Sequence, residues 1–113
     1  MKFIKSKTDY DAMQFVLLQQ IITTIHREVA DAGLSDEMVE QLTSSITFGV
    51  CVAIDGSAGM QFYDKPLYPI VTFSTDGELK SAITCGGPTW MHEYALGEVE
   101  EYFQSLPNED LSA

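Results

Sequence analysis

Lysine and arginine are scarce in this sequence, and their scarcity excludes several kinds of partner. The chain has 6 Lys and Arg against 17 Asp and Glu, so its formal net charge at pH 7 is −11. No Lys or Arg follows Lys80, and between Thr8 and Asp64 the only strong base is Arg27. Such a surface repels nucleic acid and anionic membranes and attracts basic protein surfaces. We therefore expect no direct binding to nucleic acid or to a membrane.

Long apolar runs are also missing. The longest run in the region of the first expected helix is Phe15 to Leu18, whereas a membrane-spanning helix needs about 20 apolar residues. The basic start, Met1 to Lys7, has no apolar run behind it, so we predict no export signal and a cytoplasmic location. The two cysteines, Cys51 and Cys85, form no CxxC motif, and in that compartment we expect both to be reduced thiols.

The chain has enough apolar sequence for one core. It is 113 residues long, 45% hydrophobic and 11% aromatic, which is typical of a globular domain rather than a disordered chain. A chain of this length hides roughly two thirds of its unfolded surface, so folding requires neither a metal nor a disulfide. We predict a single domain over residues 1–113 without a cofactor, ending in a short solvated tail at about 107–113.

Three segments are expected to be helical. Residues 9–32 place their apolar side chains along one arc with the 3.6-residue period of an amphipathic helix, and Gly33 follows as a stop signal. Ser35 can cap a short second helix. Thr89 can cap a final helix that runs to about Leu106.

Between these helices the period changes from 3.6 to 2. Residues 46–54 alternate bulky and small side chains, as a half-buried strand does. Shorter stretches at 60–64, 70–75 and 78–85 complete four predicted strands, and Asp76-Gly77 is a hairpin signal. The order α-α-β-β-β-β-α with short links predicts an α+β, two-layer domain, in which a four-stranded antiparallel meander sheet has the helices packed on one face.

The segment between the last predicted strand and the final helix is the densest in possible chemistry. Cys85 ends the strand, two glycines follow, and His92 and Glu93 lie in the first turn of the helix. A thiol near a helix N-terminus with a neighbouring imidazole and carboxylate is one alternative, a small enzyme. The structural alternative is a small core cysteine and a hydrogen-bonded core histidine, and it is favoured because no known nucleophile signature is matched.

Other chemistry is weakly indicated. The histidines and cysteines lack the spacing of zinc ligands, so we predict no metal site. The pair Asp55-Gly56 is interpreted first as turn chemistry.

Two helix faces are candidate interaction surfaces. The first helix has an uncharged face, which is unusual in so charged a chain and typical of an interface core. It predicts a homodimer through Met13, Val16, Gln20 and Thr24. The final helix combines acidic and aromatic residues that suit a partner with a basic surface. These partner-binding candidates are Trp90, Glu93, Tyr94, Glu100 and Glu101.

The charge, the size and these faces predict a small acidic cytoplasmic protein-binding module. A concrete form is an inhibitor or antidote that masks a basic surface, as immunity and counter-defence proteins do, and the analogy is one of charge and size rather than motif. Two alternatives stay open. One is the small enzyme that uses the Cys85/His92 region, and the other is an accessory subunit whose function requires an assembly.

Overall fold

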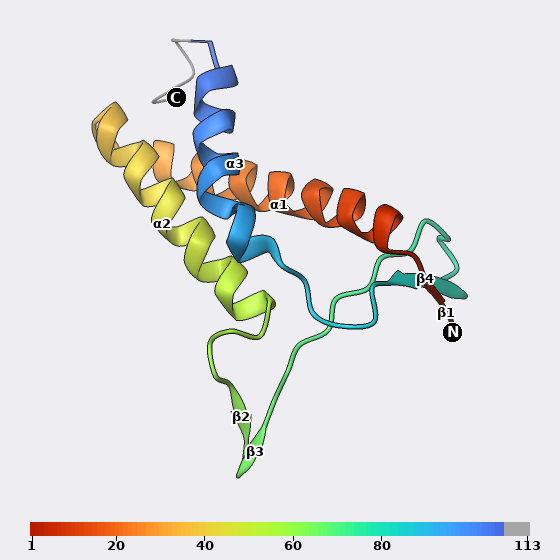
Figure 1. The fold of residues 1–113 in the computed structure, drawn as a ribbon. Helices are drawn as coiled ribbons and strands as arrows, with labels where there is room; N and C mark the ends of the chain where they lie inside the picture. The colour runs from red at the N-terminus through yellow and green to blue at the C-terminus, as the bar shows by residue number, and fades with distance from the viewer. Residues whose placement is uncertain (108–113) are drawn as a thin grey trace.

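Three helices dominate the fold, which a computed structural model describes for residues 1–107 (Figure 1). α2 and α3 lie side by side, and α1 packs across both. The described residues hold two sheets of two strands each, so the fold is α+β. The elements in chain order are β1 (Lys2–Lys5), α1 (Lys7–Ala30), α2 (Asp36–Ile54), β2 (Gln61–Phe62), β3 (Lys65–Pro66), β4 (Ser81–Thr84) and α3 (Met91–Ser105).

α1 confirms the predicted first helix, with its ends shifted by two residues. Its N-cap is Ser6, whose side chain accepts a hydrogen bond from the backbone N–H of Asp9 at 3.4 Å. Gly33, just beyond the helix, has a φ of +74°, a conformation that glycine adopts at little cost. One residue in four along the helix is buried, and the set is Tyr10, Gln14, Leu18, Ile22, His26 and Ala30.

The prediction of a strand over residues 46–54 is wrong, because this segment is helical. α2 begins at the predicted cap Ser35 and continues to Ile54. Its buried side chains recur every four residues, at Val39, Thr43, Thr47 and Cys51. This stripe of small and β-branched side chains faces the core that α2 shares with α1 and α3, and helix packing outweighs the β-propensity of the segment. Ile46 and Phe48, which a half-buried strand would have covered, are 42% and 38% exposed.

The four-stranded antiparallel meander is also wrong, since residues 1–107 contain no such sheet. The 60–64 strand is reduced to β2, which pairs antiparallel with β3 in a small hairpin. The 70–75 strand makes only an isolated bridge between Phe73 and Ile83. β4 lies inside the predicted 78–85 strand, but it pairs in parallel with β1, which was not predicted. Because 46–54 is helical, the shorter strands have no long central strand on which to assemble.

The core lies where the three helices meet. α3 confirms the predicted final helix, although it begins at Met91 and ends at Ser105. Most of the core side chains are small or aliphatic, which lets the helices approach closely. The buried cluster comprises Leu18, Ile22, Ala30, Val39, Cys51, Met91, Ala95, Val99 and Phe103.

Pro107 is exposed, and the remainder of the predicted tail, residues 108–113, lies outside the described residues. Cys51 and Cys85 are both free, as predicted. Within residues 1–107, no helix combines the length and the apolar character that crossing a membrane requires.

Candidate functional site

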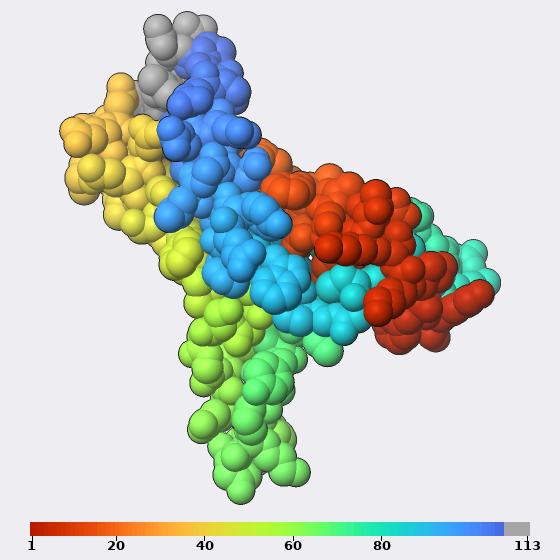
Figure 2. Space-filling model, in the orientation of Figure 1, coloured from red at the N-terminus to blue at the C-terminus, as the bar shows by residue number. Residues whose placement is uncertain are grey.

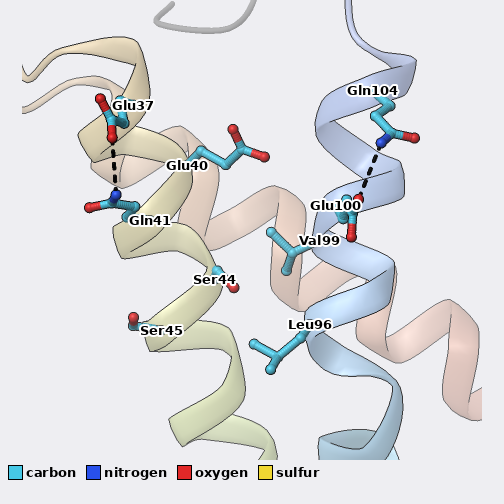
Figure 3. A pocket seen from close by; sticks show the side chains of 9 residues that line it. All are labelled: Glu37, Glu40, Gln41, Ser44, Ser45, Leu96, Val99, Glu100 and Gln104. Carbon is cyan, nitrogen blue, oxygen red and sulfur yellow. Dashed lines mark hydrogen bonds between the residues drawn. The ribbon is translucent and has the colours of Figure 1, made fainter.

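A groove of about 730 Å³ runs between α2 and α3 (Figure 3). Leu96 and Val99 point from α3 toward α2, and Glu40 points from α2 toward α3. Leu96 is 55% exposed, so the groove offers apolar surface to a ligand. Its lining residues are Glu37, Glu40, Gln41, Ser44, Ser45, Leu96, Val99, Glu100 and Gln104.

The charged residues that line the groove are all acidic. Three carboxylates line it, from Glu37, Glu40 and Glu100, and no Lys, Arg or His is among the lining residues. Two of them are oriented by neighbours one turn further on, since Gln41 and Gln104 donate from Nε2 to Glu37 and Glu100, each at 3.4 Å. An apolar floor with acidic walls is chemically suited to a cationic, amphipathic segment.

The structure places only part of the predicted partner surface in this groove. Glu100 lines it, whereas Glu93 and Glu101 are exposed on α3 and are not among its lining residues. Sequence reasoning missed Glu37 and Glu40. Their spacing of three on a predicted helix was visible, but the sequence contains no signal that this helix lies beside the final one.

The two predicted aromatic anchors lie away from the groove. Trp90 is 49% exposed and lines a separate hollow together with Lys5 and Lys7. Tyr94 is 43% exposed, and its ring contacts that of Phe15 on α1 at a centroid distance of 5.1 Å. Tyr94 therefore faces the junction with α1, and neither Trp90 nor Tyr94 is among the residues that line the groove.

A buried polar cluster joins the end of α2 to the start of α3. The carboxylate of Asp55, whose side chain is 1% exposed, accepts hydrogen bonds from the Thr89 hydroxyl, from the His92 backbone N–H at 2.6 Å and from His92 Nδ1 at 2.6 Å. From α1, Gln14 accepts from the Trp90 backbone N–H at 3.0 Å.

This cluster changes the role predicted for Thr89. The N-cap of α3 is Trp90, which makes no side-chain capping bond, and Thr89 instead donates to Asp55. Two N–H groups at the start of α3, those of Trp90 and His92, are therefore satisfied by side chains of α1 and of the α2 end, and the Asp55 charge lies at the positive end of the α3 dipole.

Cys85 and His92 are not brought together as a nucleophile and a base. The Cys85 thiol donates to the carbonyl of Gly87 at 3.3 Å, and it borders a hollow of about 360 Å³ whose lining does not include His92. His92 Nδ1 is bonded to Asp55 instead. No hydrogen bond joins the thiol to the imidazole within residues 1–107, and Glu93 is exposed. The same residues contain no cluster of three potential metal ligands.

Two buried groups near Asp55 titrate unusually. Burial, and secondarily the charge of Asp55, raise the pKa of the Cys51 thiol to about 11. Burial is also the main cause that raises the pKa of Tyr10, with smaller contributions from Cys85 and Asp55. Both groups are therefore held in their neutral forms in the folded protein.

Alkaline pH should destabilise the protein through Cys51. Its thiol loses a proton near pH 9 when unfolded and near pH 11 when folded, so the stability that it contributes is complete below pH 9 and is lost as pH rises to 11. Cys51→Ala should have a lower free energy of unfolding than the wild type at pH 7.5. This difference in free energy, the gap between the two proteins, should narrow by about 2 kcal/mol at pH 10.5. Urea unfolding at both pH values measures the gap.

Val39→Ala is the matched control for this measurement. Val39 is buried on the same stripe of α2 but does not titrate, so its gap to wild type should stay constant between the two pH values. A constant gap for Cys51→Ala as well would contradict the prediction.

The predicted homodimer residues lie on an open face of α1. Val16 is 71% exposed, Gln20 and Thr24 are exposed, and Met13 is half-buried. Two shallow hollows border this face, of about 410 Å³ and 270 Å³, and Gln20 lines both.

Three features of the described residues thus carry candidate chemistry: the acidic groove, the buried Asp55 cluster and the uncharged face of α1. A scan against protein-family models and searches of curated proteins and of solved structures find no match to this chain.

Proposed function

We propose that this protein is a stoichiometric binding module that receives a basic, amphipathic segment of a partner protein in the groove between α2 and α3. The observation that carries the proposal is the groove itself, with Leu96 and Val99 on its floor and three carboxylates around them. A segment with apolar residues on one side and Lys or Arg on the other would cover the floor and pair with the walls.

The charge of the whole chain supports the same partner. A net charge of −11 attracts a basic protein over distances beyond direct contact and accelerates its association, and salt weakens this attraction. The same field repels nucleic acid, so the partner is a protein rather than a nucleic acid.

An inhibitor or antidote acting in the cytoplasm is the specific form that we propose. Occupation of the groove by a basic surface would mask that surface from its own anionic ligands. An enzymatic function is less well supported, because no hydrogen bond joins Cys85 to His92 in the described chain. An accessory subunit would use the same groove for a permanent partner.

The test uses a synthetic helical peptide with leucines on one face and lysines on the other. We expect it to bind the wild-type protein, with an affinity that falls as salt is added. The triple variant Glu37→Lys, Glu40→Lys and Glu100→Lys should bind roughly tenfold more weakly, because three exposed ion pairs at about 0.5 kcal/mol each sum to about 1.5 kcal/mol. Fluorescence anisotropy of the labelled peptide at low and moderate salt measures both effects.

A second triple variant tests whether binding depends on the charges of the groove or only on the net charge of the protein. Glu28→Lys, Asp31→Lys and Glu78→Lys alter exposed residues outside the groove. Each triple changes the net charge from −11 to −5, because every substitution adds two positive charges. If both triples weaken binding equally, the groove has no specific role and the proposal fails. Circular dichroism checks that both variants remain folded.

A further inference from the structure

The hairpin formed by β2 and β3 projects from the body of the protein as an arm (Figures 1 and 2). The two strands pack on each other and on no other helix or strand of residues 1–107. The radius of gyration is 16.1 Å, larger than the roughly 13 Å expected of a compact chain of this length. The arm, residues 60–70, is therefore joined to the body only through the two segments that connect it.

The arm exposes large apolar side chains to water. Five of them lie along it, with exposed fractions of 61% for Phe62, 86% for Tyr63, 46% for Leu67, 68% for Tyr68 and 67% for Ile70. Together they leave on the order of 500 Å² of side-chain surface uncovered. An exposed apolar patch of this size is often a functional surface.

The distribution of charge points to a second copy of the same chain as the occupant. Two molecules of net charge −11 repel each other, so contact between them is least unfavourable through surfaces that carry no net charge. The arm is one such surface, because its only charged residues are Asp64 and Lys65. The face of α1 is the other, since residues 12–25 contain no Asp, Glu, Lys or Arg.

The shape of the α1 face suits the side chains of the arm. One hollow, of about 410 Å³, is bordered by Phe15 and Val16, and the adjacent one, of about 270 Å³, by Ile21, Ile25 and Val50. These walls are mainly apolar, and Gln20 lies between the hollows and lines both. Two neighbouring aromatic side chains at the tip of an arm could occupy two neighbouring hollows.

We propose that the protein forms a two-fold symmetric dimer in which the β2–β3 arm of each copy docks Phe62 and Tyr63 on the uncharged face of α1 of the other. Such an exchange is self-complementary, as a two-fold interface must be. Two arms and the two faces that receive them would bury about 2,000 Å², the size of a stable interface. This surface is distinct from the α2–α3 groove, so the dimer is independent of the proposed function.

The oligomeric state tests the proposal. Sedimentation equilibrium should show a dimer for the wild type. The double variant Phe62→Ser and Tyr63→Ser should raise the dimer dissociation constant by about a hundredfold or more, and Val16→Glu should do the same from the receiving face. The arm variant should retain the fold, which circular dichroism verifies, because the arm packs on no other element.

Leu96→Ser is the matched control for these variants. Leu96 is an exposed apolar residue like those of the arm, with an exposed fraction of 55%, but it lies in the acidic groove. Its substitution should weaken binding of the basic peptide and leave the dimer intact, whereas the arm variant should do the reverse. Failure of the one proposal is thus distinguishable from failure of the other.

A cross-link tests the contact directly. In a Cys85→Ala background, a Tyr63→Cys copy mixed with a Gln20→Cys copy and oxidised glutathione should give a disulfide-linked heterodimer. A Tyr63→Cys copy mixed with a Glu28→Cys copy should give none, because Glu28 lies beyond the uncharged segment of α1. A monomeric wild type at its highest soluble concentration, or a dimer that survives both the arm and the Val16 variants, would overturn the proposal.

Discussion

Asp55→Ala should lower the free energy of unfolding by about 3–4 kcal/mol, a large part of the stability of a domain of this size. The buried carboxylate accepts hydrogen bonds from Thr89 and from both the backbone and the ring of His92. Alanine would leave the Thr89 hydroxyl buried without a partner and the two half-buried His92 donors unpaired, and each loss of a buried partner costs about 1–3 kcal/mol. The α3 N-terminus would also lose the negative charge that its dipole favours.

Urea unfolding of two control variants shows how much of this loss of stability is due to the burial of the Asp55 carboxylate. Thr89→Val removes one donor and leaves the other two bonds, so it should cost about 1 kcal/mol. Asp76→Ala removes a carboxylate that also accepts two backbone N–H bonds, from Glu78 and Lys80, but in an exposed turn, so it should cost no more than about 1 kcal/mol. Equal losses for Asp55→Ala and Asp76→Ala would show that the buried cluster has no special weight.

Tyr10→Ala should destabilise the protein by about 3–5 kcal/mol, the usual cost of removing a fully buried aromatic ring. The side chain of Tyr10 is 0% exposed. Its ring contacts Phe73 edge-on at 5.2 Å, and its hydroxyl donates to the carbonyl of Val71 at 2.6 Å. Tyr10 therefore holds the irregular segment between β3 and β4 against α1, and its loss should release that segment as well as open a cavity.

Tyr10→Phe separates the ring from the hydroxyl. It keeps the contact with Phe73 and removes only the bond to Val71, so it should cost about 1 kcal/mol. Urea unfolding gives both losses, and hydrogen exchange of the Phe73 amide, which bonds to the Ile83 carbonyl at 3.1 Å, should accelerate markedly only in Tyr10→Ala. Similar losses in the two variants would mean that the ring contributes little.

The helices that were predicted correctly have local signals. In α1 the apolar side chains recur with one period over the whole length, and Gly33 follows the helix. For α2 only the start was predicted correctly, since the cap Ser35 accepts a hydrogen bond from the Met38 backbone N–H, as its position before the helix suggests. Caps, stops and periods of this kind depend on neighbours in sequence, so they can be recognised without the fold.

Residues 46–54 show where such signals fail. Their alternation of bulky and small side chains satisfies a strand, while Val39, Thr43, Thr47 and Cys51 also form a helical stripe. Both periods are present, and a short apolar run cannot choose between them. The choice depends on what covers the segment, and here α3 offers a complementary face through Ala95 and Val99.

Some features of the candidate functional surfaces can be predicted from the sequence, and others depend on the tertiary structure. The acidic charge, the uncharged face of α1 and the candidate Glu100 follow from the sequence alone, because charge and helical position are properties of single residues and their near neighbours. The groove requires α2 beside α3, and the role of Asp55 requires Thr89, 34 residues later, to pack against it. In the sequence Asp55 is a turn residue before a glycine. Only the tertiary structure decides that it is a buried acceptor, because burial and long-range hydrogen bonds depend on which surfaces meet.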